Sequence, residues 1–337
     1  MTKTFRVGIA GYGVVGRRRH QFIDDHPLLE TVAVSDIKLA NQRSINGIKI
    51  YTDYKNLFKE NLDILFVSLP NYLAPTATIA GLENNCHVFC EKPPGRNVND
   101  VLEVQSVEKK FPKAKLKYGF NHRYHENVKH ALTIISGESL GGIINVRGVY
   151  GKSKIISFKS DWRTKRAQAG GGILLDQGIH MLDLMRMFSG EFTEVSSFIS
   201  NDYWKHDVED NAYALMRTDA GIVASIHSSA TQWLHQFRLE IALDKGLIVL
   251  AGILSGSKSY GDETISVYEK LDEDRLSEET TKYTQDNSWR DEIAEFVSAI
   301  VEDCHIVDGN SEDALKTMEL VYQIYRADAL WATRYVL

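Results

Sequence analysis

The sequence predicts an α/β protein, with a doubly wound parallel sheet at the N-terminus followed by a second α/β domain containing a large, mostly antiparallel open sheet. Three observations predict this class. In the first 120 residues, short apolar runs alternate with stretches of helical spacing, as in parallel βαβ units. The run DILFVSL at 63–69 is continuously apolar, as expected of a strand covered on both faces. From about 193 to 283, strand-like segments follow one another with few helices between them.

We expect the first domain to span residues 1–120 and the second to span 121–337. The strands predicted for the first domain are Phe5–Ala10, Thr31–Ser35, Ile48–Tyr51, Asp63–Leu69, His87–Cys90 and Lys115–Phe120. Helices are predicted from the glycines through Phe22 and Ile23, then over 57–62, Thr76–Asn84 and Asn99–Lys110.

In the second domain, helical spacing predicts helices over His125–Ser136, Ile173–Phe188, Ser288–Val301 and Ser311–Trp331. Strands are predicted at Ile143–Tyr150, Ala212–Arg217, Ile222–His227, Phe237–Leu243 and Leu247–Leu250. The C-terminal helix is a candidate to pack back on the first domain. No internal repeat or low-complexity linker separates the two domains, so we expect them to share a cleft.

Composition excludes several classes of protein. The 337 residues carry a net charge of −6 with no long basic block, which argues against a nucleic-acid partner. No apolar stretch approaches the roughly 20 residues of a membrane span. The first residues run directly into a strand, which leaves no room for a signal peptide. Three cysteines cannot form a disulfide framework and indicate a reducing compartment, so we expect a cytoplasmic protein.

A glycine-rich turn follows the first predicted strand and opens a helix, with the residues Gly11, Tyr12, Gly13, Val14, Val15 and Gly16. Gly11 suits a tight turn, Gly13 lets the backbone approach a pyrophosphate, and Gly16 lets the helix pack on the strand. The helix N-terminus offers free N–H groups to phosphates. The turn therefore predicts a Rossmann domain that binds a dinucleotide; the alternative is a glycine-rich turn that binds nothing.

Asp36, at the end of the second predicted strand, indicates which dinucleotide binds. A carboxylate there accepts from the ribose hydroxyls of NAD and repels the 2′-phosphate of NADP. NAD is therefore the predicted cofactor, and NADP is less favoured, although Lys38 lies close by in the sequence. Arg17–Arg19 lie beside the positive end of a helix dipole and predict an anion nearby.

Lys92, Asp176 and His180 are the candidate catalytic residues. Oxidising a secondary alcohol requires a base for the hydroxyl proton, and histidine suits that task at neutral pH. Asp176 and His180 lie four residues apart on a predicted helix and so face the same way. Lys92 follows a strand at the carboxyl end of the parallel sheet, where such sheets bind ligands. We assign His180 as general acid/base, Lys92 as the group that polarises the substrate oxygen, and Asp176 as a substrate-orienting group. Lys92 is the alternative acid/base, and a solvated lysine with a surface Asp/His pair is the structural alternative.

Several motifs resemble the glucose–fructose oxidoreductase / inositol dehydrogenase / MocA family. They are Leu65-Phe-Val-Ser-Leu-Pro70-Asn71, Val88-Phe-Cys-Glu91-Lys92-Pro93, Trp162-Arg163, Gly170-Gly-Gly172, Asp176-x-Gly178-x-His180-x-x-Asp183, Val208-Glu-Asp210-Asn and Ala314-Leu315. The resemblance implies a Rossmann domain followed by an α/β domain whose open sheet mediates association, here as a homodimer or homotetramer. It also implies a pyridine-nucleotide reaction at a carbohydrate carbon, with Lys92, Asp176 and His180 in the catalytic positions.

The same resemblance places Pro70, Asn71, Glu91 and Lys92 beside the cofactor and implies a cis bond before Pro93. The chain departs from the family pattern at Ala74, where a histidine often follows the Pro-Asn turn, so one contact in the cleft is in doubt.

Four further residues are candidates for substrate binding. Asn121 and Arg123 follow the last Rossmann strand, and an interdomain bridge is their structural alternative. Trp162 and Arg163 lie in a basic, aromatic loop that would suit a sugar, and a solvated surface is their alternative. No carboxylate cluster accompanies the nearby histidines, so we predict no metal site.

Taken together, these features predict an NAD(P)-dependent oxidoreductase. It would transfer a hydride between nicotinamide and a secondary alcohol or ketone carbon of a sugar, amino sugar or nucleotide sugar. Two alternatives stay open. One is redox-assisted glycoside cleavage with retained NAD, and the other is a non-catalytic nucleotide-sensing protein.

Overall fold

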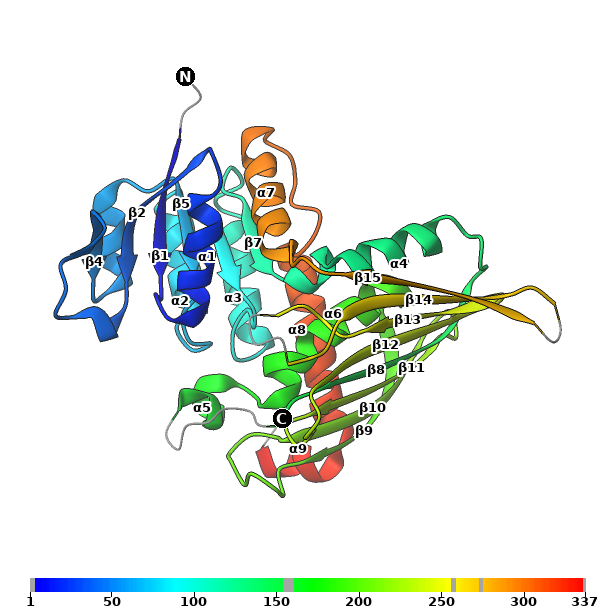
Figure 1. The fold of residues 1–337 in the computed structure, drawn as a ribbon. Helices are drawn as coiled ribbons and strands as arrows, with labels where there is room; N and C mark the ends of the chain where they lie inside the picture. Colours follow the sequence, from blue (N-terminus) through cyan, green and yellow to red (C-terminus); the bar gives the residue numbers. More distant parts are fainter. Residues whose placement is uncertain (1–3, 154–160, 256–258, 273–274, 336–337) are drawn as a thin grey trace. The chain divides into compact units, whose positions relative to one another are not determined.

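The computed structural model describes residues 4–153, 161–255, 259–272 and 275–335. Their contacts divide the chain into two compact units (Figure 1). The first unit contains Met1–Phe120, Ala167–Ala169 and Trp289–Lys316, and the second contains Asn121–Arg166, Gly170–Ser288 and Thr317–Leu337. Each unit is described by itself below. None of the described helices is long and apolar enough to cross a membrane.

The first unit is built on a sheet of the predicted doubly wound type. Its described strands follow the order β3-β4-β2-β1-β5-β6-β7, and every neighbouring pair is parallel except β3 with β4. The strands are β1 (Phe5–Ala10), β2 (Leu29–Ser35), β3 (Ser44–Ile45), β4 (Ile48–Tyr51), β5 (Ile64–Val67), β6 (His87–Glu91) and β7 (Leu116–Gly119). The predicted strands are confirmed, and only the two-residue β3 is new. The helix expected over 57–62 is instead a 3₁₀ helix, Tyr54–Glu60.

Helices flank this sheet. They are α1 (Val14–Asp24), α2 (Ala74–Glu83), α3 (Val98–Glu108) and, from Trp289 onwards, α7 (Ser288–Val301). Helix α7 contributes Phe296 to the core of this unit, where its ring packs edge-on against Phe66 and Phe89 at 6.3 and 5.6 Å. A segment distant in sequence from residues 1–120 therefore completes the core beneath this sheet.

The second unit contains the large, mostly antiparallel sheet. Its described strands follow the order β15-β14-β13-β12-β8-β11-β10-β9, and only β8 with β11 is parallel among these pairs. The strands are β8 (Ile143–Gly151), β9 (Phe192–Ser200), β10 (Asn211–Thr218), β11 (Val223–Ser229), β12 (Gln236–Leu243), β13 (Gly246–Ala251), β14 (Glu263–Lys270) and β15 (Leu276–Tyr283).

One face of this sheet is apolar and lies against helices, because alternate residues such as Val146, Met216 and Leu239 are buried. The helices are α4 (Glu126–Ser136), α6 (Ile179–Ser189), α9 (Ala329–Tyr335) and, from Thr317 onwards, α8 (Ser311–Ala327). The short helix α5 (Arg166–Ala169) belongs to the first unit from Ala167 onwards. The helix predicted over Ser311–Trp331 is interrupted at Asp328, whose carboxylate accepts from the N–H groups of Leu330 and Trp331, both at 3.0 Å, and so starts α9.

The opposite face, called the outer face here, carries exposed apolar side chains. The register places Phe198, Tyr213 and His227 side by side on β9, β10 and β11. Phe198 is 79% exposed, and Leu215, two residues beyond Tyr213, is 60% exposed. The rings of Tyr213 and His227 stack at 3.9 Å. This arrangement forms an apolar strip across one end of the sheet.

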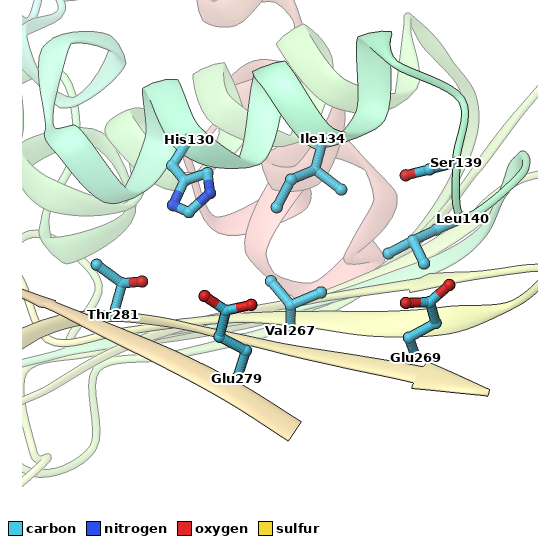
Figure 2. A pocket seen from close by; sticks show the side chains of 8 residues that line it. All are labelled: His130, Ile134, Ser139, Leu140, Val267, Glu269, Glu279 and Thr281. Carbon is cyan, nitrogen blue, oxygen red and sulfur yellow. The ribbon is translucent and has the colours of Figure 1, made fainter. Parts of the chain in front are cut away.

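A hollow of about 220 Å³ lies between α4 and the strands β14 and β15 (Figure 2). Its lining residues are His130, Ile134, Ser139, Leu140, Val267, Glu269, Glu279 and Thr281. The strand register places this hollow toward the end of the sheet where β8 begins, at Ile143. The candidate substrate groups described below follow Gly151, at the other end of β8.

Candidate functional site

In the glycine turn, each glycine meets the steric demand predicted for it. Gly11 has φ +90°, and a Cβ there would lie 2.4 Å from the carbonyl oxygen of Ser68. A Cβ on Gly16 would lie 2.0 Å from the carbonyl oxygen of Gly11. A Cβ on Gly13 would meet no atom within 4 Å, so this part of the turn faces open space. The turn therefore has room for a phosphate where the predicted contact requires it.

The start of α1 is also suited to an anion. Gly13 is its N-cap and supplies no side-chain hydrogen bond, and the first turn contains no acidic residue. Val14 is 88% exposed at the first helical position. Uncapped N–H groups at a helix N-terminus bind phosphate oxygens. These features support the prediction that Val14, Val15 and Gly16 hold the pyrophosphate of NAD, and their role stays a prediction.

Asp36 lies beside the glycine turn. One carboxylate oxygen accepts from the backbone N–H of Tyr12 at 3.1 Å, and the other accepts from that of Lys38 at 2.8 Å. These bonds fix the carboxylate at the carboxyl end of β2 and leave acceptor capacity for ribose hydroxyls. The local geometry therefore fits NAD, and the Lys38 contact in the structure is made by its backbone.

Arg19 does not serve an anion site. Its side chain is fully buried, donates to Glu91 and to Glu292 at 2.6 Å each, and lies 4.3 Å from the rings of Phe89 and Trp289. Burial raises the pKa of Glu292 to about 7, against the opposing effect of Arg19. The expectation that an anion balances all three arginines is wrong for Arg19, because two carboxylates distant in sequence balance it.

Glu91 is held by Arg19 at the end of β6, immediately before Lys92. The Lys92–Pro93 peptide bond is cis, as the resemblance implies. Pro70 accepts through its carbonyl from the N–H groups of Leu73 and Ala74, at 2.8 and 3.0 Å, which begins α2. These contacts place the predicted cofactor-side residues at the carboxyl ends of β5 and β6.

Asn71 is buried, and its amide donates to the carbonyl of Ala169 at 2.7 Å, within the first unit. The described contact fixes a loop. The role of Asn71 in cofactor binding stays a prediction, as do the roles of Pro70, Glu91 and Lys92.

In the second unit, Glu209 organises the segment that carries Asp176 and His180. Its carboxylate is fully buried and accepts from the N–H groups of Gly172 and Leu174, at 2.7 and 3.0 Å, and from the hydroxyl of Tyr325 at 2.7 Å. Burial raises the pKa of Glu209, while these hydrogen bonds oppose the shift. The carboxylate thus caps the start of the helical segment.

The same packing explains the glycine triplet. A Cβ on Gly171 would lie 2.1 Å from the Tyr325 hydroxyl, and a Cβ on Gly172 would lie 2.0 Å from the carbonyl of Glu209. The two motifs thus contact one another, which their positions in the sequence do not indicate.

Asp176 lies in a π-helical turn, Leu174–Gly178, that precedes α6. The predicted continuous α-helix is therefore wrong over this turn, where the wider π spacing changes the angle between Asp176 and His180. The Asp176 carboxylate accepts from Lys152 Nζ at 2.9 Å, and Arg163 Nε lies 3.9 Å from its other oxygen. The Arg163 guanidinium lies 4.4 Å from the ring of Trp162. Three of the predicted residues are therefore neighbours.

Lys152 was missed by sequence analysis. The available signal was its position, because it directly follows β8 at the end of a buried strand. Its side chain is only 17% exposed, and its ammonium lies 2.9 Å from the Asp176 carboxylate.

His180, on α6, is 4% exposed and stacks on His122 with ring centroids 3.7 Å apart and an interplanar angle of 13°. His122 in turn contacts the Tyr150 hydroxyl at 3.1 Å. Burial raises the pKa of Tyr150 well above its ordinary value. His180 therefore faces an aromatic, largely dry surrounding within its unit, with a second imidazole against its ring.

Arg123 and Asn121 are engaged inside the second unit. Arg123 forms a bidentate ion pair with Asp183, at 2.8 and 2.7 Å, and both side chains are buried. Asp183 also accepts from Thr317 at 3.3 Å. Asn121 donates to Ser288 at 3.1 Å. These contacts favour a structural role for both residues, and substrate binding by them stays a prediction.

The structure thus gathers the candidate residues in two sets, one in each unit. The first unit holds the glycine turn, Asp36 and Lys92. The second holds Asp176, His180, Trp162 and Arg163 together with Lys152. In the first set, Cys90 lies under the end of β6, and burial raises the pKa of its thiol to about 12, which suits a packing role.

Comparison with known proteins agrees with this geometry. Residues 5–120 match the family model described as oxidoreductase family, NAD-binding Rossmann fold, and residues 128–249 match the GFO/IDH/MocA C-terminal domain. D-glucoside 3-dehydrogenase of Escherichia coli (strain K12) is 29% identical over 206 residues, which cover 59% of this chain and 58% of the relative. Myo-inositol 2-dehydrogenase of Thermotoga maritima is 27% identical over 258 residues, covering 72% and 74%.

Among solved structures, levoglucosan dehydrogenase in complex with NADH aligns with a TM-score of 0.87 at 20% identity, covering 98% of each chain. That likeness concerns the fold. The two matched models describe two parts of one family and together cover most of the chain, in the order seen in the structure. The chain therefore belongs to the GFO/IDH/MocA family of NAD-binding oxidoreductases.

Proposed function

We propose that this chain catalyses NAD-dependent oxidation of a secondary alcohol carbon of a carbohydrate, or the reverse reduction, with His180 as general acid/base. Lys92 stabilises charge on the reacting oxygen, and Asp176 orients the substrate. The single observation that supports this most strongly is the arrangement around Asp176 and His180. Both side chains follow the capped glycine triplet, and each is held by a specific neighbour, Lys152 or His122.

The chemistry follows from the residue types. His180 takes the hydroxyl proton at an imidazole nitrogen when the alcohol is oxidised and returns it when the ketone is reduced. The Lys92 ammonium favours negative charge on the substrate oxygen as that proton leaves. Bound NAD supplies the hydride acceptor, at nicotinamide C4. Asp176, paired with Lys152, presents an acceptor and a donor side by side, as vicinal hydroxyl groups require.

The substrate class we propose is a sugar, an amino sugar or a nucleotide sugar. Relatives named as a glucoside dehydrogenase and an inositol dehydrogenase support a polyhydroxylated substrate. The ring of Trp162 beside Arg163 offers an apolar face with an adjacent cation, which suits a sugar ring carrying an anionic substituent. Retained-NAD glycoside cleavage and nucleotide sensing without catalysis are not favoured by the comparisons.

The test is the near-ultraviolet absorbance of the protein with NAD and, separately, with free sugars, sugar acids, cyclitols and nucleotide sugars. We expect a reduced-nicotinamide band with one class. His180→Ala and Lys92→Ala should each lower kcat/KM by about 10²-fold or more, because acid–base groups contribute about 10²–10⁴. The exposed His305 provides the control, since His305→Ala should leave the rate unchanged.

Full activity in His180→Ala would contradict the assigned role. Turnover of a glycoside without accumulation of the reduced band would instead indicate that the cofactor is retained. NAD binding without turnover of any compound would support the sensing alternative.

We also propose that the outer face of the second sheet joins copies of this chain as a homodimer or homotetramer. Exposed Phe198, Tyr213 and Leu215 support this, because contiguous exposed apolar side chains mark association surfaces. Light scattering should give a mass of two or four chains. A single-chain mass at micromolar concentration would refute the proposal.

A further inference from the structure

A line of hydrogen bonds runs behind His180 through the second unit. It begins at the Tyr150 hydroxyl, 3.1 Å from His122 Nε2, and continues from His122 Nδ1 to Asn121 Oδ1 at 3.2 Å. The Asn121 amide then donates to Ser288 Oγ at 3.1 Å, and Ser288 Oγ donates to Asp286 at 2.6 Å. The first four residues are all buried.

The direction of this line follows from counting protons. An ionised carboxylate only accepts, so the single hydroxyl proton of Ser288 points to Asp286. Ser288 Oγ can then only accept from Asn121, which therefore turns its NH₂ group toward Ser288 and its carbonyl oxygen toward His122. Facing an acceptor, His122 Nδ1 must carry a hydrogen.

The other nitrogen of His122 is then the acceptor of the ring. Tyr150 keeps its hydroxyl proton, because burial raises its pKa well above the ordinary value, and it can donate to Nε2. With Nδ1 donating and Nε2 accepting, both nitrogens of a neutral imidazole are satisfied. Asn121 is itself uncharged and offers no counter-charge to an imidazolium. These two hydrogen bonds therefore favour one neutral tautomer of His122.

Other titratable groups surround this ring. His180 stacks on it, His125 meets it edge-on at 5.5 Å, and Tyr150 lies against it from β8. His125 is paired with the buried Glu263 at 2.7 Å, and Tyr260 packs against Tyr150. Asp286 lies at the far end of the line, separated from His122 by the side chains of Asn121 and Ser288. The Glu263 carboxylate is thus paired with His125.

We infer that His122 is a positioning residue for His180, a neutral imidazole held in one tautomer whose face supports the His180 ring and favours its protonated form. This inference rests on the proposed function, in which His180 takes up the substrate proton. A neutral aromatic face attracts a cation stacked on it, whereas a second imidazolium at 3.7 Å would repel it. The hydrogen-bonded line favours the neutral form of His122, so that the positive charge gained with the substrate proton resides on His180.

The first measurement does not depend on activity. Nitrogen NMR of the full-length protein labelled with ¹⁵N-histidine, assigned with His122→Phe, reports the tautomer of His122. We expect a neutral ring with hydrogen on Nδ1 from about pH 6 to pH 8, a range that spans the ordinary histidine pKa. Titration of His122 within that range, or hydrogen on Nε2 in the neutral ring, would overturn the inference.

The second measurement compares three variants by the pH profile of kcat/KM. His122→Phe keeps a flat ring under His180, so the plateau should stay within about threefold of the original and the acid limb should not move. His122→Ala removes the ring and should lower the plateau about tenfold or more. Asn121→Asp places a carboxylate on Nδ1 and charges His122, so the acid limb should move about one unit lower and the plateau should fall.

The NMR and kinetic measurements together distinguish failure of this inference from failure of the proposed function. Equal loss in His122→Phe and His122→Ala would make His122 a proton carrier and overturn the positioning role. An unshifted acid limb in Asn121→Asp, with His122 shown by NMR to be charged, would also overturn it. If NMR shows the neutral tautomer but His180→Ala remains fully active, the proposed function fails while the described hydrogen-bond line stands.

Discussion

Gly13 and Gly16 lie three residues apart in one turn, yet alanine at the two positions should have opposite consequences. At Gly13 a methyl group would meet no atom within 4 Å, and its φ of −77° suits any residue. We expect Gly13→Ala to leave the free energy of unfolding unchanged. The methyl group would occupy the space through which a pyrophosphate approaches the backbone, so NAD binding should weaken at least tenfold, about 1.4 kcal/mol.

At Gly16 the methyl group would lie 2.0 Å from the carbonyl oxygen of Gly11 and 3.4 Å from Ile9. Backbone atoms cannot rotate away, so α1 must shift from β1. Overpacking of this kind costs about 1–3 kcal/mol, which lowers the melting temperature by several degrees in a unit of this size. Gly16→Ala should therefore lose stability without NAD present.

The assay pairs thermal unfolding of the free protein with titration of NAD followed by fluorescence or calorimetry. The expected pattern is wild-type melting with weak binding for Gly13→Ala, and a lowered melting temperature for Gly16→Ala. Gly13→Ala that binds NAD as tightly as the original chain would refute the placement of the pyrophosphate at this turn. Gly16→Ala with an unchanged melting temperature would refute the steric reasoning.

Three further substitutions test buried carboxylates. Glu209→Gln would turn an amide N–H toward the N–H of Gly172, which now donates to the carboxylate. One unsatisfied buried donor costs about 1–3 kcal/mol. We therefore expect both kcat and the melting temperature to fall. Asp210 accepts from two backbone N–H groups on one carboxylate oxygen and from the Asn211 amide, at 3.1 Å, on the other. Asp210→Asn turns an NH₂ group toward one of these donors, so it should lose stability while keeping kcat. For Glu292 the folded pKa is raised from 4.5 to about 7, so the folded state binds more protons and stability falls as pH rises between these values. Glu292→Gln should remove this fall, at most about 3 kcal/mol, in urea unfolding at several pH values.

Equal loss of kcat in Glu209→Gln and Asp210→Asn would show that buried charge in general, and not the cap on the glycine triplet, supports activity. A Glu292→Gln protein with the same pH slope as the original would mean that Arg19 keeps this carboxyl ionised when folded.

Local patterns predicted most of the fold but few of the contacts that build the site. Strands such as Ile48–Tyr51 and helix Ser288–Val301 are correct to the residue, because short-range periodicity and turn residues specify them. The π-helical turn at Leu174–Gly178 was missed, because no local pattern marks it. The carboxylate that caps the preceding glycine triplet comes from Glu209, more than 30 residues later in the chain.

The same limit applies to individual side chains. Lys152, His122 and Glu209 have no local signature that marks them as partners of Asp176, His180 and Gly172. Arg19 was expected near an anion, and its two carboxylate partners come from β6 and α7, far apart in the chain. Pairings of this kind arise only when the chain is folded.

The strand order of the second unit has a consequence for how the chain is made. Strand β8 ends at Gly151, but the strands on both of its sides, β11 and β12, begin only at Val223 and Gln236. During synthesis both edges of β8 therefore stay unpaired until most of the chain has been made. Unpaired strand edges can pair with strands of other chains and cause aggregation. Long-range closure of this kind also slows folding. Truncated chains that end before Val223 should consequently aggregate. In a fragment of residues 1–120, by contrast, every strand of the first sheet has its neighbouring strands within the fragment.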